Sequence, residues 1–217
     1  MKILLCLVYL VCVGSSLAAG PEDNHVRPCQ KDDLDCIKRF FAMKFKCTPG
    51  SADSHIIKVK QQRFEVPVTG MTVTIHNAQV KGLDKGQIQE FYINNKTDIL
   101  VMEVTFDQIV IDSERTEWVQ YHMGRAPTEV EDYTSSIFKD LKLTMTILNV
   151  SDLNSSSCYV YTLIPVASDV NLIKGPGLAG LDVTELFNMA RDAMLTEGKA
   201  LMEAFLRSQI CDLKCEI

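Results

Sequence analysis

The middle of the sequence alternates between apolar and polar residues, and this alternation commits it to β-structure. The cleanest example is residues 141–147, where every second residue is apolar; residues 71–76 and 100–107 show the same period. Successive side chains of a strand point to opposite faces, so such segments bury one face and expose the other. Residues 81–86 are expected to form a turn, and residues 124–133 a loop. Weaker strand candidates are residues 56–60, 88–94, 117–122 and 159–166.

A short helix is expected before this β region, over residues 33–46. Its apolar residues recur at helical spacing, and Asp32, Asp33 and Asp35 lie where a helix N-terminus favours negative charge. The same aspartates could suggest a calcium site, but the spacing, the glycine and the final glutamate of an EF-hand loop are missing. The cluster is therefore interpreted as the start of a helix.

A long helix is expected after the β region, over residues 183–211. Asp182 and Glu185 form a capping box, the apolar residues follow one helical stripe, and Gly198 could mark a bend. The order of helix, antiparallel strands and long helix predicts one α+β domain. A curved antiparallel sheet wrapped along the last helix would bury its stripe and enclose an elongated apolar interior.

The first residues are typical of a secretory signal peptide. Lys2 precedes a short apolar run, and small residues follow up to Ala18. The alternative, a retained membrane anchor, is disfavoured because the run is shorter than the ~20 residues that span a bilayer. Residues 1–18 are therefore expected to be removed, leaving residues 19–217 as a single secreted domain without stable membrane insertion.

Cysteines and sequons fit an exported chain. Of the eight cysteines, Cys6 and Cys12 lie in the expected leader, and an even set remains that favours disulfides without fixing their pairing. Two of these, Cys211 and Cys215, could instead present thiolates to a metal, but no histidine nearby completes a site. The remaining cysteines are Cys29, Cys36, Cys47, Cys158, Cys211 and Cys215. Candidate N-glycosylation sites are Asn95, Asn149 and Asn154.

The sequence shows no catalytic apparatus. Common hydrolase, nucleotide-binding and metalloprotease motifs are missing, and the four histidines are scattered along the chain. We therefore expect no enzymatic activity, no cofactor and no metal. The net charge of −6 argues against a nucleic-acid partner, because phosphates are bound by basic surfaces.

Several segments together resemble the insect juvenile hormone binding protein and takeout family. They are Cys29 and Cys36 with the acidic stretch between them, NAQVKGL at residues 77–83, Cys158 followed by Pro165 and residues 168–170, and Ile210 with Cys211. Their order and approximate spacing carry the resemblance over most of the chain. The proline-rich segment that this family has after its first helix is absent.

The resemblance implies a fold and a set of disulfides. The fold would be α+β, with a short N-terminal helix and a long C-terminal helix wrapped by a highly curved antiparallel sheet. The implied bridges are Cys29–Cys36 and Cys158–Cys211; Cys47 and Cys215 are left over and could pair with each other.

The resemblance also implies a secreted carrier for a small apolar ligand, such as a juvenile hormone-like terpenoid or another lipid. The alternative is a secreted interaction protein of the same fold that binds a protein partner or a microbial lipid. Candidate pocket residues are apolar positions on the helices and the facing strands: Phe41, Val73, Ile75, Val104, Phe187 and Met194.

Overall fold

The computed structural model describes residues 24–49, 56–66, 70–152, 157–163, 171–179, 191, 195 and 198–213. The expected leader, two of the six candidate pocket residues (Phe187 and Met194) and Asn154 lie outside these residues. No described helix is both long enough and apolar enough to span a membrane.

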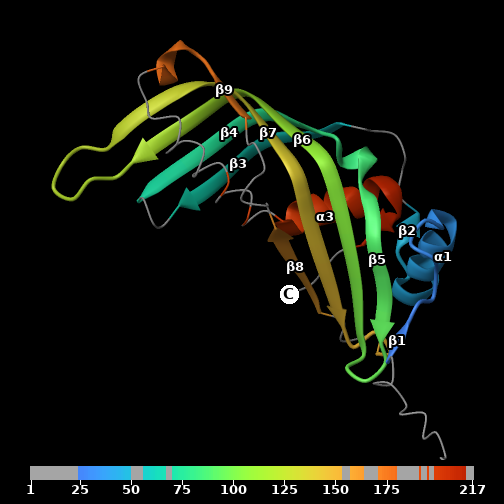
Figure 1. Cartoon of the computed structure of the whole chain (residues 1–217). Helices are drawn as coiled ribbons and strands as arrows, with labels where there is room; N and C mark the ends of the chain where they lie inside the picture. Colours follow the sequence, from blue (N-terminus) through green and yellow to red (C-terminus); the bar gives the residue numbers. More distant parts are fainter. Residues whose placement is uncertain are drawn as a thin grey trace, which may run out of the picture.

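Most described residues belong to one antiparallel sheet built on two long strands. β6 (Ile99–Gln120) and β7 (Thr128–Leu148) are 22 and 21 residues long and pair along nearly their whole lengths (Figure 1). The predicted strand over residues 100–107 and residues 117–120 of the predicted strand 117–122 are parts of β6, which ends at Gln120. The predicted loop over residues 124–133 is wrong from Thr128 onward, because these charged residues pair with β6 on an exposed hairpin.

The two long strands are shared by two halves of the sheet. In one half, β5 (Gln87–Asn94) pairs with β6 and β8 (Cys158–Leu163) pairs with β7, while β1 (His25–Val26) lies beside β5. The other half adds three strands: β4 (Met71–Lys81) on β6, β3 (Ile56–Val66) on β4, and β9 (Asn171–Lys174) on β7. The short 3-10 helices are η1 (Leu83–Lys85) and η2 (Pro176–Leu178).

α1 (Leu34–Phe45) confirms the first predicted helix to within a residue or two at each end. The Asp33 carboxylate accepts a hydrogen bond from the Cys36 backbone N–H at 2.9 Å, which satisfies one of the unpaired donors of the first turn. The helix ends at Lys46, whose φ of 51° places it in the left-handed region.

The described part of the second predicted helix is α3 (Gly198–Gln209), and residues 191 and 195 are also helical. The predicted end at Cys211 is wrong. Cys211 instead belongs to β10 (Cys211–Asp212), which pairs with β2 (Thr48–Pro49). The strand pairing holds this segment beside the residues that follow α1, so the helix stops after Gln209.

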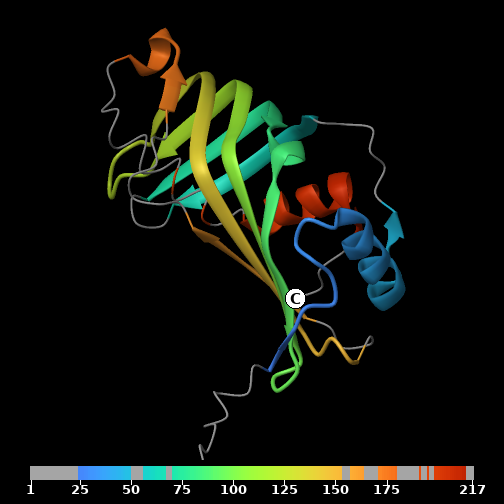
Figure 2. The same cartoon turned by 45° about the vertical axis from the view of Figure 1, so that its right-hand side comes forward.

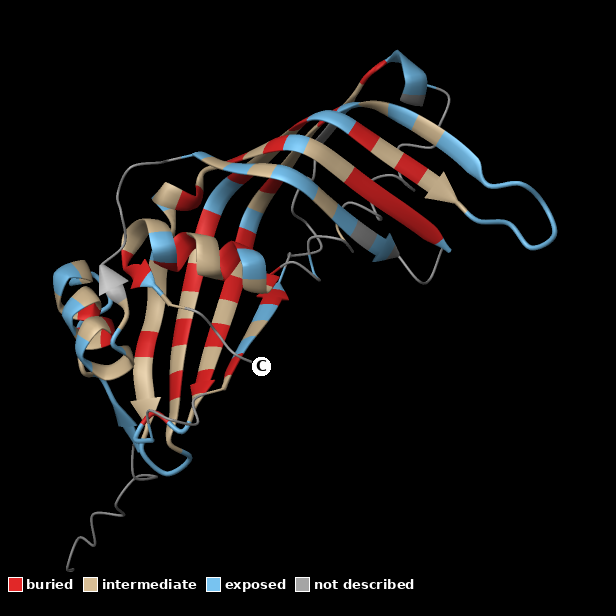
Figure 3. Cartoon of the chain, turned by 180° about the vertical axis from the view of Figure 1, so that it is seen from behind, coloured by how far each residue is buried: buried red, intermediate tan, exposed pale blue. Residues whose placement is uncertain are grey.

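The core lies between the helices and the β5–β8 half of the sheet. Alternate residues of β6 and β7 are buried on the face that α3 covers (Figures 2 and 3). Aromatic rings fill the contact. The ring centroids of Phe205 on α3 and Phe106 on β6 lie 5.6 Å apart in an edge-on arrangement, and those of Phe41 on α1 and Phe91 on β5 lie 6.1 Å apart. The fully buried side chains of this layer are Ile37, Phe41, Phe91, Leu100, Met102, Val104, Leu143, Met145, Met202 and Leu206.

Two disulfides close the helical layer. The expected Cys29–Cys36 bridge is present. The other joins Cys47 to Cys211, so the expected pairings Cys158–Cys211 and Cys47–Cys215 are both wrong. The cause is the β2–β10 pairing, which brings Cys211 next to the end of α1. Cys158 is also disulfide-bonded, and Cys215 lies outside the described residues.

Candidate functional site

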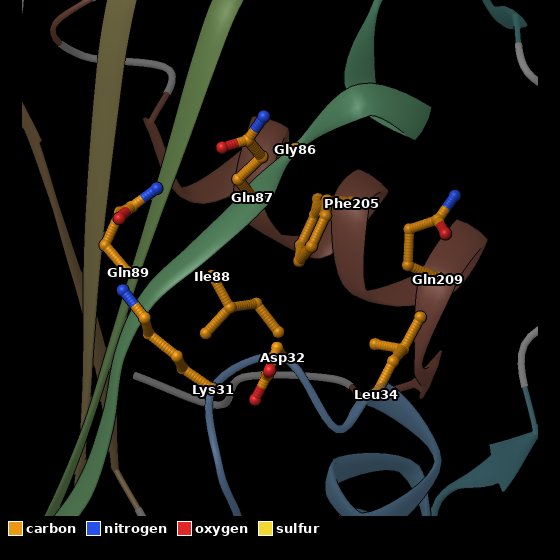
Figure 4. A pocket seen from close by; sticks show the side chains of 9 residues that line it. All are labelled: Lys31, Asp32, Leu34, Gly86, Gln87, Ile88, Gln89, Phe205 and Gln209. Atoms are coloured by element: carbon orange, nitrogen blue, oxygen red, sulfur yellow. The ribbon is translucent and has the colours of Figure 1, made fainter.

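A cavity of about 370 Å³ opens between the start of α1, the start of β5 and α3; we call it the β5–α3 cavity (Figure 4). Leu34, Ile88 and Phe205 converge on it from these three elements and give it an apolar floor. The side chains that complete the lining are polar, apart from one glycine: Lys31, Asp32, Gly86, Gln87, Gln89 and Gln209. A floor of carbon under a polar rim suits an amphipathic molecule.

Gly86 sets the shape of this cavity. A Cβ at this position would lie 2.5 Å from the Phe106 ring and 2.7 Å from the Phe205 ring, so any side chain would displace one of them. Gln89, which also lines the cavity, donates a hydrogen bond of 2.9 Å from its Nε2 to Thr105 Oγ1. The absence of a side chain at Gly86 therefore lets α3 approach the strand closely. The hydrogen bond to Thr105 holds the Gln89 side chain against β6.

The pocket residues predicted from sequence lie elsewhere. Phe41 and Val104 are fully buried in the core, Val73 is buried on β4, and Ile75 is half-buried there. None of these four lines the β5–α3 cavity. Sequence reasoning missed the cavity because Leu34, Ile88 and Phe205 are ordinary apolar residues, and only their tertiary arrangement leaves space between them.

A second feature is the outer face of β8. Tyr159, Tyr161 and Leu163 are 52%, 65% and 41% exposed, and we call them the tyrosine strip. The intervening Thr162 is buried, and a Cβ added to Gly198 of α3 would meet its hydroxyl, so the strip points away from the helix. The sequence carried a signal here, since both faces of residues 159–163 lack charge, whereas a solvated face is normally polar.

The two described sequons lie in neighbouring turns at one end of the sheet. Asn95 and Asn149 are exposed. Asp98, in the turn after Asn95, accepts a hydrogen bond of 2.8 Å from the hydroxyl of Ser151, and its backbone carbonyl accepts one from Val150. We call this end the sequon pole.

Charged side chains on the described surface form ion pairs rather than a metal site. No group of three or more potential metal ligands occurs among the described residues. The most constrained carboxylate is Asp112 on β6: Lys81 Nζ donates to it at 2.7 Å and Ser135 Oγ at 2.6 Å. These two hydrogen bonds lower the pKa of Asp112 below its ordinary value, because they favour the charged form.

Solved structures that resemble this chain include two of low sequence identity. Takeout 1 of Epiphyas postvittana aligns with 84% of this chain and 91% of its own, at 13% identity and a TM-score of 0.47. A lipopolysaccharide binding protein aligns with 86% of this chain at 12% identity and a TM-score of 0.29, and this chain spans only 38% of its length. Membership of the juvenile hormone binding protein and takeout family stays a prediction.

Comparison of sequences is more specific. The chain is 27% identical over 205 residues to Fibrohexamerin of Galleria mellonella, and the alignment covers 91% of this chain and 93% of that protein. The sequence model of the family described as Fibroin P25 matches residues 25–215. This match takes in both helices, the whole described sheet and both disulfides. The chain therefore belongs to the Fibroin P25 family.

Proposed function

We propose that this chain is a secreted interaction protein that binds a fibroin chain, and that its role is binding rather than catalysis. The observation that carries the proposal is the match to the Fibroin P25 family over residues 25–215, together with the likeness to Fibrohexamerin over 91% of the chain. The description of the family names fibroin. Of the two roles expected from the sequence, the family favours the one with a protein partner.

Two features support secretion. Residues 1–18 have the pattern of a signal peptide, and the described chain contains disulfides, which persist in oxidising compartments. The layer beneath the tyrosine strip also suits a binding platform. The two helices are fixed to the sheet by buried aromatic contacts, and the Cys47–Cys211 bridge joins the ends of the helices to each other, so the outer surface is presented on a rigid support.

The test is co-secretion. The tagged chain is expressed in insect cells together with fibroin chains of the same organism, and the tag is captured from the medium. We expect a fibroin chain to co-purify at a fixed stoichiometry through size-exclusion chromatography. A tagged secreted protein from outside the Fibroin P25 family serves as the control. Recovery of the chain alone, with fibroin present in the same medium, would contradict the proposal.

A second candidate function is that of a carrier, favoured by the β5–α3 cavity. Its volume of about 370 Å³ lies within the range of small-ligand sites, and its apolar floor and polar rim suit an amphipathic lipid or terpenoid. Native mass spectrometry of the secreted protein, followed by organic extraction, tests this role. A stoichiometric apolar adduct supports it. A clean apo mass without displacement of a fluorescent lipid probe argues against it.

A further inference from the structure

The tyrosine strip is unusual among the described strands of its half of the sheet. On β7, the residues paired with Tyr159 and Tyr161 are Thr146 and Thr144, and Leu163 is paired with Lys142. These partners are polar and only half-buried. Of the four exposed large apolar side chains on the described strands of that half, three lie on β8, where they gain nothing from the core, and one, Val26, lies on β1.

The strip is also uncharged, in a chain whose net charge is −6. No residue of β8 is ionisable at neutral pH. Lys142, the β7 residue paired with Leu163, is held at 2.9 Å by Glu103 of β6, so this pair neutralises itself. Exposed edge strands are normally protected from pairing by lysine, proline or a bulge. β8 contains no lysine or proline, and its register with β7 is unbroken, so the strand lacks this protection. Because the strip carries no charge, it favours a partner segment that is itself uncharged.

The position of β8 in the sheet defines how such a partner would bind. Among the described strands, β8 pairs only with β7, and it forms one end of the β1-β5-β6-β7-β8 order. An extended segment placed beside it would continue the sheet, and its alternate side chains would pack against the two tyrosines. Tyrosine is enriched at such contacts because its ring buries a large area at small entropic cost.

We propose that β8 is the docking strand for fibroin: an extended, uncharged segment of the fibroin chain adds to the sheet beside β8 and packs on the tyrosine strip. This inference rests on the proposed function, because it takes its partner from there. It adds the surface, the conformation of the bound segment and its lack of charge.

The test uses peptides that tile the fibroin chain in overlapping segments and the full secreted protein. The strip variant combines Tyr159→Lys with Tyr161→Lys. The matched control combines Tyr121→Lys with Tyr133→Lys, since these tyrosines are 54% and 50% exposed on other strands or loops. All four side chains face solvent, and circular dichroism checks that each variant is folded.

We expect an uncharged peptide to bind the wild type and the control equally, and to bind the strip variant at least ~10-fold more weakly, as for loss of an interface hot spot. Amide hydrogen exchange of the wild type supplies evidence that needs no variant: bound peptide should protect the amides of residues 158–163.

Three other results would overturn the inference. Equal binding by the strip variant, or no protection of β8, would place fibroin elsewhere and leave the proposed function standing. Binding of whole fibroin without binding of any peptide would exclude an extended segment. Failure of whole fibroin to co-purify with the wild type would instead overturn the proposed function itself.

Discussion

At the scale of single residues, Gly198 decides how closely α3 approaches the sheet. A Cβ at this position would collide with the hydroxyl of Thr162, which is buried and has no hydrogen-bond partner. Gly198→Ala should improve helix propensity by up to ~1 kcal/mol. Overpacking should outweigh this gain and lower the free energy of unfolding by ~1–3 kcal/mol.

A double-mutant cycle separates these two effects. Adding Thr162→Ala to Gly198→Ala removes both the collision and the buried hydroxyl, so the double variant should recover most of the lost stability. Urea denaturation of the four proteins measures the coupling. Additive losses, with no recovery in the double variant, would show that the collision with Thr162 is not the cause.

Asp112 predicts how the sheet responds to acid. Its pKa is lowered in the folded protein by hydrogen bonds from Lys81 and Ser135, so its stabilising effect is present above the unfolded pKa of about 4 and is lost as pH falls through the lower folded value. The carboxylate is 37% exposed, so the effect should stay below ~1 kcal/mol.

Asp112→Asn should therefore be slightly less stable than the wild type at pH 7, and the difference should disappear near pH 2. Urea midpoints measured across this range provide the check. Asp152→Asn serves as the control, because Asp152 is an exposed carboxylate on another part of the chain. A deficit in Asp112→Asn that persists unchanged to pH 2 would contradict the assignment.

At the scale of elements, the periodic patterns of the sequence predicted those helices and strands that interactions between nearby residues determine. α1 was predictable because Asp33 caps a helix whose apolar residues recur at helical spacing, and the core of β7 was predictable because residues 141–147 alternate. The continuity of β6 was not. Its register shifts between Ser113 and Thr116, which breaks the alternation although the strand continues. Residues 128–133 were missed because their charges are tolerated on an exposed hairpin.

The candidate site was less predictable than the fold. A cavity forms where side chains from different elements do not fill the space between them, and no periodic pattern in the sequence indicates where this happens. The strip was closer to detection, because Tyr159 and Tyr161 repeat at strand spacing. Their exposure, however, depends on Thr162 being the residue that faces α3. The erroneous disulfides have the same origin, since Cys47 and Cys211 are 164 residues apart and meet only through β2 and β10.

The disulfides give a prediction at this scale. Chain entropy assigns about 5 kcal/mol to the loop closed by Cys47–Cys211 and about 2 kcal/mol to the short loop of Cys29–Cys36. Cys47→Ser with Cys211→Ser should therefore destabilise the protein more than Cys29→Ser with Cys36→Ser, as measured by thermal unfolding. The reverse order would mean that the long bridge adds little to stability.

Peptide mapping of the non-reduced secreted protein checks the pairing itself. We expect linked peptides for Cys29–Cys36 and Cys47–Cys211. Cys158 is disulfide-bonded, and Cys215 is the cysteine of the expected mature chain that remains, so a third linked pair should join them. A peptide that links Cys158 to Cys211 would contradict the described bridge.

At the scale of the whole molecule, the tyrosine strip begins close to the sequon pole and runs away from it, since Tyr159 is paired with Thr146, three residues before Asn149. Asn95 and Asn149 lie in turns beyond the ends of the strands, tied together through Asp98 and Ser151. A glycan there would cover the end of the sheet, whereas β8 runs away from that end. We expect both sequons to be occupied, and we expect fibroin to approach along the strands.

Two substitutions at Asn149 separate the effect of its glycan from that of its backbone. Asn149 has a φ of 55°, which glycine adopts without strain and glutamine does not. Asn149→Gly and Asn149→Gln both remove the sequon, but only the glutamine variant should lose a further ~1 kcal/mol of stability. Glycopeptide mass spectrometry and thermal unfolding measure the two effects. If both variants also keep wild-type fibroin binding, the glycan lies outside the interface; weaker binding by both would place the interface at the sequon pole rather than along β8.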